Sequence, residues 1–180
     1  MHNLLKRRNF LKACLGAGAI LATPSALARA ISPAERTLAF HNLHTGEDLE
    51  VAYWANGDYL GDELTAVNRL LRDFRTGEIH PIDTALLDQL YLLQHQMGTE
   101  RAFHVISGYR SPQTNASLRS TSSGVAKRSL HMQGKAIDIR LPGANLAELH
   151  RTAMAMKAGG VGYYPKSDFI HIDTGRVRYW

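Results

Sequence analysis

Residues 136–173 read AIDIRLPGANLAELHRTAMAMKAGGVGYYPKSDFIHID and predict a strand, a helix and two paired strands in that order. Apolar and β-branched residues at the start of this segment favour the first strand. Asn145 is a typical helix N-cap, and the apolar spacing after it predicts a helix that ends at Gly159-Gly160. The expected elements are a strand over 136–140, a helix from 146, and strands over 162–164 and 169–173.

The residues before this segment predict a hairpin, two helices and one strand. Alternating apolar residues on either side of Thr45-Gly46 are typical of a β-hairpin. Apolar residues at spacings of three and four predict two amphipathic helices, the second N-capped by Asp83 and ended by Gly98. We expect a hairpin over 37–53, helices over 61–75 and from Asp83 to Gly98, and a strand over 103–106. Residues 107–123 are rich in Gly, Ser, Pro and Asn, and we assign them no helix or strand.

This order of elements predicts an α+β fold, a single domain with a small, mainly antiparallel sheet and packed helices. The chain has 180 residues, of which 44% are hydrophobic and 21% charged. Such values are typical of one globular domain with a sizeable core. They exclude a disordered chain, a collagen and a disulfide-stapled miniprotein.

The first 28 residues have the three parts of a secretory signal. A basic segment, residues 6–8, precedes an apolar segment over 13–22 and small residues before Ala28. An anchored or amphipathic N-terminal helix is the alternative. The apolar segment is shorter than the roughly 20 residues that span a bilayer, so we expect no membrane anchor.

Arg7-Arg8 followed by Phe10-Leu11-Lys12 resembles the twin-arginine (Tat) signal, which directs folded proteins across the bacterial inner membrane. We therefore expect the Tat export machinery as a partner and the periplasm as the location. Cleavage after Ala28 would leave a domain over 29–180, and Ala30 is the alternative cleavage site.

Processing also changes the charge of the protein. The formal net charge is +5, and removal of residues 1–28 removes four cations and no acid, which leaves +1. This small charge gives little support to nucleic-acid binding, so we expect no nucleic-acid partner. Cys14 is the only cysteine and leaves with the same segment, so the mature chain has neither a disulfide nor a thiol nucleophile. We expect the mature protein to be a monomer.

Three residues have the types and spacing of metal ligands. A turn at Gly134 would bring His131 beside Asp138 on the following strand, and His171 lies on another apolar strand. Two imidazoles and one carboxylate suit zinc and leave a fourth position for water, as in catalytic zinc sites. Zinc lowers the pKa of its water to roughly 7 and polarises a carbonyl, which suits a chain without a Gly-x-Ser-x-Gly nucleophile. The spacing alone equally fits a buried core histidine.

The pattern Ser-x-His-x-x-Gly-x-Ala-x-Asp over 129–138, followed by His171, resembles the zinc site of the D-Ala-D-Ala peptidase and lysostaphin-like superfamily of metallopeptidases. Further segments resemble the MepK-type murein endopeptidases of the periplasm. These segments are HNLHTGE (41–47), SGYRS (107–111), AGGVGYYP (158–165) and HIDTG (171–175). They keep their order along nearly the whole mature chain.

The resemblance implies that His131, Asp138 and His171 hold Zn²⁺ and that the substrate is the peptide cross-link of peptidoglycan. It also implies that Arg110 polarises the substrate carbonyl or binds a carboxylate, which suits a planar guanidinium. A structural contact from Arg110 to a carbonyl or an acid is the alternative.

The general base is less well defined. Related peptidases carry an acid three residues before the last zinc histidine, and Asp168 stands there. Asp173 would share one strand face with His171, so it could act as the base or orient a metal ligand. We favour Asp173 for a role at the site and keep Asp168 as the alternative base.

Other residues are candidates for contact with the substrate. Ser129 and Asn115 could donate hydrogen bonds to it, and Tyr109, Tyr163 and Tyr164 could form a wall of the cleft. Aromatic residues at such positions equally fit packing. The cations Arg119, Lys127 and Arg128 could attract carboxylates of a peptide stem, or be solvated in a loop.

We therefore predict a zinc endopeptidase that hydrolyses peptidoglycan cross-links. A carboxypeptidase that removes terminal D-Ala is the first alternative. A noncatalytic module that binds the cell wall or zinc is the second.

Overall fold

A computed structural model describes residues 34–122 and 124–180. The predicted signal peptide and its cleavage site lie outside these residues. Among the described residues, no helix has the length and apolar character needed to span a bilayer. The elements are β1 (Glu35–Asn42), β2 (Asp48–Ala55), β3 (Asp58–Tyr59), α2 (Gly61–Leu70), α3 (Thr84–Gln96), β4 (Phe103–Ser107), α4 (Pro112–Thr121), the 3₁₀ helix η1 (Leu130–Gln133), β5 (Ala136–Arg140), α5 (Leu146–Met156), β6 (Gly160–Tyr164), the 3₁₀ helix η2 (Pro165–Ser167), β7 (Phe169–Asp173) and β8 (Arg178–Tyr179).

One sheet joins all the described strands in the order β3-β2-β1-β4-β5-β7-β6-β8. Its pairings are antiparallel except for β1 with β4 and β6 with β8. The α+β prediction and the mainly antiparallel sheet are thus confirmed. The sheet is larger than predicted because the short strands β3 and β8 extend it at both edges.

The sheet has one apolar face and one polar face, because successive side chains of a strand point to opposite sides. Phe40, Val105, Ile139 and Ile170 are at most 1% exposed and belong to one apolar core. Asp138 lies between Ile137 and Ile139 in β5, so it points to the opposite face. His171 pairs with Asp138 and points the same way.

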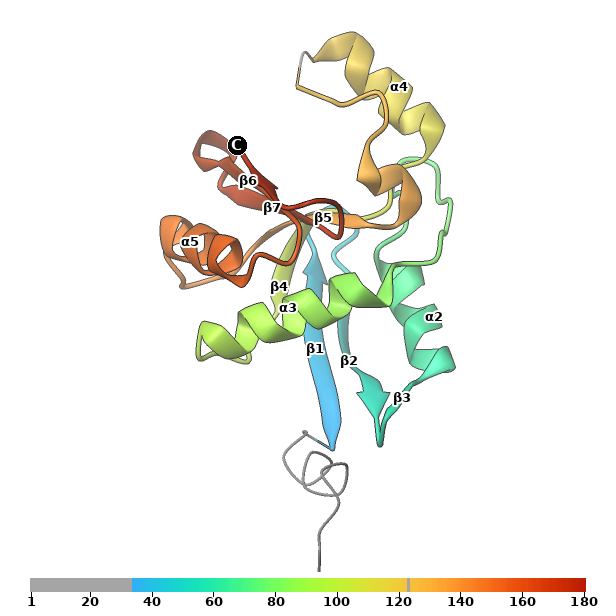
Figure 1. The fold of residues 1–180 in the computed structure, drawn as a ribbon. Coiled ribbons are helices and arrows are strands. Elements are labelled where there is room, and N and C mark those ends of the chain that lie inside the picture. Colours follow the sequence, from blue (N-terminus) through green and yellow to red (C-terminus); the bar gives the residue numbers. More distant parts are fainter. Residues whose placement is uncertain (1–33, 123) are drawn as a thin grey trace, which may run out of the picture. The chain divides into compact units, whose positions relative to one another are not determined.

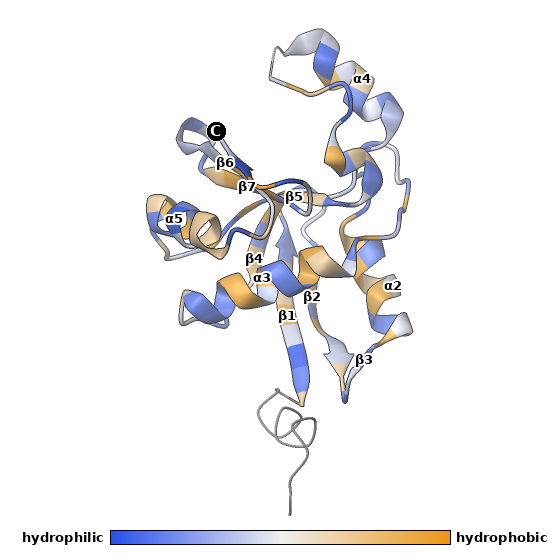
Figure 2. Cartoon of the chain, in the orientation of Figure 1, coloured by the Kyte–Doolittle hydropathy of each residue, from blue (hydrophilic) through white to orange (hydrophobic). Residues whose placement is uncertain are grey.

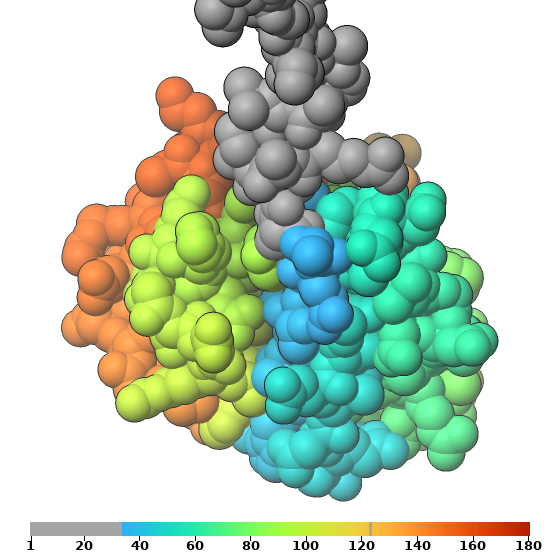
Figure 3. Space-filling model, turned by 90° about the horizontal axis from the view of Figure 1, so that it is seen from below, coloured from blue at the N-terminus to red at the C-terminus, as the bar shows by residue number. Residues whose placement is uncertain are grey.

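Helices α2, α3 and α5 pack on the apolar face (Figure 1). Seen from the end at which β1 begins, α3 lies between β1 and α5 (Figure 3). Leu90 of α3 and Leu149 of α5 are at most 1% exposed. The predicted caps begin these helices, since Asp83 accepts a hydrogen bond from the Ala85 amide and Asn145 accepts from those of Ala147 and Glu148.

Helix α2 ends at Leu70, earlier than the predicted end at residue 75. Two tertiary contacts use the carbonyls that a longer helix would need. The Asn42 side chain donates to the Leu70 carbonyl at 2.9 Å, and the Tyr109 amide donates to the Leu71 carbonyl at 2.7 Å. The chain therefore leaves the helix at the point where β1 and the segment after β4 bind it.

The segment over 107–123 contains α4, a helix that composition did not predict. Ser111 caps its N-terminus by accepting from the Thr114 amide, and Pro112 occupies the first turn, where proline is tolerated. Figure 2 shows that α4 is largely hydrophilic. Its weak apolar pattern explains why periodicity did not reveal it.

Gly159-Gly160 does not end α5 as predicted. The helix ends at Met156, and Lys157 takes the left-handed conformation with φ 51°. The two glycines instead allow close approach of other groups. A Cβ on Gly159 would collide with the Asp173 carbonyl, and one on Gly160 would lie 2.6 Å from the Asp173 carboxylate.

Candidate metal centre

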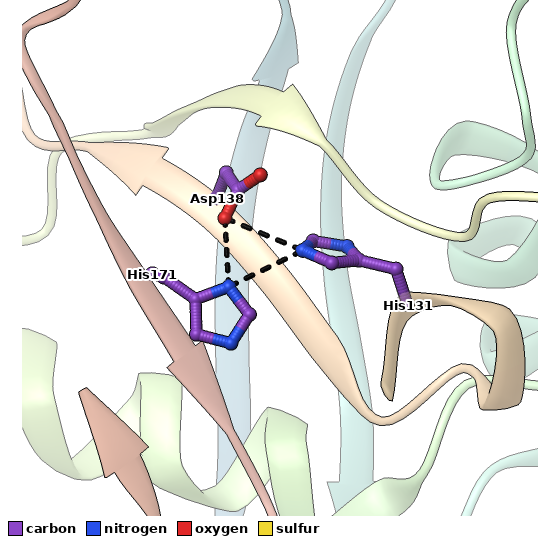
Figure 4. A group of neighbouring side chains, drawn as sticks. All are labelled: His131, Asp138 and His171. Atoms are coloured by element: carbon purple, nitrogen blue, oxygen red, sulfur yellow. Dashed lines mark hydrogen bonds and ion pairs between the residues drawn. The ribbon is translucent and has the colours of Figure 1, made fainter. Parts of the chain in front are cut away.

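Three predicted ligands converge on the polar face of the sheet (Figure 4). Asp138 in β5 and His171 in β7 are direct partners in the antiparallel register. His131 comes from η1, and the chain turns back at Gly134 with φ 64°. A Cβ at Gly134 would collide with the Pro81 carbonyl, so the turn needs glycine both for its φ and for space.

The facing atoms of these residues lie within hydrogen-bond distance. His171 Nδ1 is 2.9 Å and His131 Nε2 is 3.3 Å from Asp138 Oδ1, and the two nitrogens are 3.2 Å apart. All three residues are buried, with exposed fractions of 3–9%. One nitrogen from each ring and one carboxylate oxygen thus surround a single point, as metal ligands do.

The outer contacts of the two histidines favour the tautomers that bind a metal. His131 Nδ1 lies 2.7 Å from the Gly108 carbonyl, which can only accept, so this nitrogen carries the proton. His171 Nε2 lies 2.9 Å from Asp173 Oδ2 and donates to it in the same way. In the neutral rings, the facing nitrogens then present lone pairs to each other and to Asp138. A cation between them would remove this repulsion, so the donor set fits a metal ion.

Electrostatics at the centre also favour a cation. Burial opposes ionisation of Asp138, but the charges and hydrogen bonds of His131 and His171 outweigh it and hold its pKa well below the usual range. Burial lowers the pKa of His171, but contacts with Asp138 and Asp173 outweigh this and raise it. The centre therefore favours positive charge beside the ionised Asp138 carboxylate, and either a proton on His171 or a metal ion between neutral rings can supply that charge.

Asp173 is fully buried and holds His171 rather than facing solvent. Its Oδ1 accepts from the amides of Gly160 and Gly175 and from Arg178, and its Oδ2 accepts from His171 and Arg178. Burial opposes its ionisation, but these contacts outweigh it and keep its pKa low. Because both oxygens are fully used, the geometry supports the second of the two roles predicted for Asp173, that of orienting His171, rather than that of a general base.

Asp168, the alternative base, lies outside the centre. It follows η2 in the left-handed conformation, is exposed, and pairs with Arg140 at 3.1 Å. It is not among the residues that line the cleft over the metal centre. The turn before β7 places its side chain beside Arg140 and outside the lining of the cleft, so its position does not fit the role of a base.

A cleft of about 680 Å³ opens over the metal centre. Arg110, Ser129 and Tyr164, all predicted to contact substrate, line this cleft, and so does the flanking cation Arg128. The Arg110 guanidinium lies 3.3 Å from the Ser107 hydroxyl and 3.7 Å from Asp138 Oδ2. Burial lowers its pKa, although Asp138 opposes that change.

Three residues expected at the cleft have packing roles instead. Tyr109 is 4% exposed, and its hydroxyl donates to Glu78 at 2.6 Å. Asn115 is 2% exposed, and its amide donates to the Ala126 carbonyl at 3.2 Å, so it supports the loop beside the cleft. Tyr163 stacks on His150 in α5, because alternation along β6 turns it to the apolar face. Because Tyr109 and Asn115 are buried and bonded within the protein, the prediction that they contact substrate is corrected.

Sequence reasoning missed Arg178 and Trp180, which both line the cleft. Arg178 pairs with Asp173 through both terminal nitrogens, at 3.0 and 2.6 Å. Trp180 lies beside His171, with ring centroids 5.2 Å apart. No motif spacing points to either residue. The one available signal was Gly162, since a glycine inside a strand can mark the close approach of another group.

Comparison with known proteins agrees with this arrangement. A family model described as Peptidoglycan L,D-endopeptidase MepK matches residues 30–180. The peptidoglycan L,D-endopeptidase MepK of Escherichia coli (strain K12) is 48% identical over 166 residues, which cover 92% of this chain and 90% of that protein. The probable peptidoglycan L,D-endopeptidase MepK of Haemophilus influenzae is 43% identical over 157 residues, which cover 87% and 84%.

Proposed function

Because this chain belongs to the MepK family of peptidoglycan endopeptidases, we propose that it hydrolyses murein cross-links with a zinc ion held by His131, Asp138 and His171. The observation that carries the proposal is the convergence of these three side chains in the lining of one cleft. A zinc ion supplies a Lewis acid for the carbonyl and activates water at neutral pH.

We propose that the bond is an L,D bond, as in the names of the relatives. A link between two diaminopimelates joins an L centre to a D centre, whereas a link from D-Ala to diaminopimelate joins two D centres. Arginines suit such a substrate because peptide stems carry free carboxylates. Arg110, Arg128 and Arg178 line the cleft, and Asp138 is the only acid among the described residues that line it.

The residues around the centre have separate tasks in this proposal. Asp173 and the Gly108 carbonyl hold the two imidazoles in position. Arg110 lies at the edge of the centre and stays charged at neutral pH, so it can stabilise negative charge on the carbonyl oxygen of the scissile bond. Ser129 lines the cleft, and its hydroxyl can form a hydrogen bond with the main chain of the substrate peptide.

The test is digestion of cross-linked muropeptides by the purified protein, followed by mass spectrometry. Dimers linked through two diaminopimelates should split into monomers, and a chelator should stop the reaction until zinc is restored. His131→Ala should abolish cleavage of the dimers, and a His131→Ala protein that still cleaves them would contradict the proposal. Loss of a single alanine would indicate the carboxypeptidase, and binding without cleavage would indicate the noncatalytic module.

We propose that Tat export carries the protein to the periplasm. The support is Arg7-Arg8 and the segments after them, together with the cell-wall substrate named for the relatives. Replacing both arginines with lysine should keep the protein in the cytoplasm with its N-terminal segment uncleaved. Mass spectrometry of the exported protein would distinguish cleavage after Ala28 from cleavage after Ala30. Normal export of the double variant would contradict the proposal.

A further inference from the structure

Trp180 lies at the rim of the metal centre, although no sequence pattern connects it with the predicted ligands. Its ring is 5.2 Å from the His171 ring, and it lines the same cleft as Arg110 and the three proposed ligands. Trp180 is 48% exposed, so about half of a large aromatic residue that lines the cleft remains open to solvent. A single exposed aromatic residue is ordinary, and the way in which this one is held is more informative.

Several independent contacts fix the indole. Its Nε1–H donates to the Tyr164 hydroxyl at 2.8 Å, and Tyr164 itself stacks on Phe169. The main chain of Trp180 makes two hydrogen bonds with β6: its carbonyl accepts from the Tyr163 amide at 2.9 Å, and its amide donates to the Val161 carbonyl at 3.3 Å. The Arg178 guanidinium lies 5.0 Å from the ring. Trp180 is therefore a rigid surface, which loses little conformational freedom when a ligand packs on it.

Gly162 provides the space for this arrangement. A Cβ at residue 162 would lie 2.6–2.8 Å from three atoms of the indole, closer than any ordinary contact. Gly162 pairs with the metal-ligand candidate His171 across β6 and β7. The indole thus lies across β6 beside His171 because residue 162 has no side chain.

We infer that Trp180 is a substrate-binding residue, which packs its indole against the methylene chain of the diaminopimelyl residue next to the scissile bond. This inference rests on the proposed murein endopeptidase function. A flat apolar ring suits the hydrocarbon chain of that residue, and the arginines of the cleft suit its carboxylate. The indole would thereby hold the carbonyl over the metal centre and select stems with a long aliphatic side chain.

Steady-state kinetics on a diaminopimelate-linked dimer test this inference. Trp180→Ala should raise KM about 10-fold, the effect of losing contact with two or so methylene groups, and leave kcat within about 3-fold. Trp180→Phe should restore most of the loss, because it keeps a flat apolar face. Gly162→Ala should mimic Trp180→Ala, because it displaces the indole without removing it. Tyr179→Ala is the matched control and should keep the wild-type KM.

Two results would overturn the inference. One is a wild-type KM for Trp180→Ala. The other is a joint loss of kcat and bound zinc, which would assign Trp180 to structural support of His171. A wild-type protein that leaves every cross-link intact would instead contradict the proposed function itself.

Fluorescence provides a second measurement that does not depend on turnover. Trp54 is the only other tryptophan, and it lies in β2 under Arg36. In Trp54→Phe, all indole emission comes from Trp180. Titration with the uncross-linked disaccharide tetrapeptide should change the intensity or wavelength of this emission in a saturable way. Unchanged emission at concentrations that inhibit cleavage would refute the contact.

Discussion

Each histidine of the metal centre uses one ring nitrogen for a protein contact and leaves the other for a metal. His131 is held by a main-chain carbonyl, whereas His171 is held by the Asp173 carboxylate. The contact between His171 and Asp173 joins two side chains, so a substitution of Asp173 can change it. Arg178 and two glycine amides hold Asp173 in turn.

Asp173→Asn should lower zinc affinity or kcat/KM by about 10- to 100-fold, the usual effect of losing a carboxylate that orients a metal-bound histidine. An amide can donate to His171 as well as accept, so it no longer sets the tautomer. Zinc titration and muropeptide kinetics measure the two effects. Wild-type zinc affinity together with wild-type kinetics would contradict the orienting role.

Asp168→Asn should leave kcat/KM within about 2-fold of wild type. Asp168 is exposed, and a surface ion pair such as that with Arg140 contributes at most about 1 kcal/mol. The same dimer cleavage assay measures this variant beside Asp173→Asn. A large loss of kcat would instead restore Asp168 as the candidate general base.

At the scale of elements, two turns are especially important: one brings His131 to the sheet, and the other holds the start of α4. The turn at Gly134 returns the chain from η1 to β5 and brings His131 to Asp138. The turn around Asp73 follows α2. The Asp73 carboxylate accepts a hydrogen bond from the Arg75 amide within the turn, at 3.0 Å, and another from the amide of Ser111, the N-cap of α4, at 2.9 Å.

Gly134→Ala should destabilise the protein by about 2 kcal/mol or more and weaken zinc binding. The left-handed backbone alone costs roughly 1–2 kcal/mol for a residue with a Cβ, and this Cβ also collides with the Pro81 carbonyl. Denaturant unfolding and zinc titration measure the effects. Gly61→Ala is the control, because a Cβ there meets nothing within 4 Å. Equal unfolding midpoints for the two variants would argue against a strained turn.

Asp73 should contribute stability that depends on pH. Burial opposes its ionisation, but hydrogen bonds from Thr114, Ser111 and Arg75 outweigh it and lower its pKa to about 2. The folded pKa lies below the unfolded value of 3.8, so the contribution is complete well above pH 4 and is lost as the pH falls toward 2. The stability difference between wild type and Asp73→Asn should shrink by about 2 kcal/mol over that range. Denaturant unfolding at several pH values measures it, and a constant difference would contradict this assignment.

At the scale of the described domain, the metal centre and the apolar core lie on opposite faces of one sheet. Leu38, Phe40 and Ile139 are buried among α2, α3 and α5, whereas Asp138 and His171 point away from them. The core can therefore form without the metal. Metal binding adds stability only through its preference for the folded state.

A chelator should abolish activity while the protein stays folded at 25 °C. The melting temperature should fall on chelation and rise with zinc concentration. At a free zinc concentration of 100 times the dissociation constant, the free energy of unfolding should be about 2.7 kcal/mol higher than without zinc. Circular dichroism and differential scanning calorimetry measure the two effects. Unfolding of the metal-free protein at 25 °C would show that the core depends on the metal.

Local signals in the sequence were enough to predict most elements and to place His131 near Asp138. The resemblance to zinc peptidases was needed to add His171 as the third residue of the metal centre. Asp83 and Asn145 mark helix starts because a cap bonds amides only two or three residues away. His131 and Asp138 lie on either side of the turn at Gly134, so their spacing predicts that they come close together. Only the tertiary structure decided which way Tyr109 and Asn115 point, that both oxygens of Asp173 are used, and that Trp180 lies beside His171. These outcomes depend on the pairing of strands and loops distant in sequence, and a residue's own neighbours along the chain carry no record of that pairing.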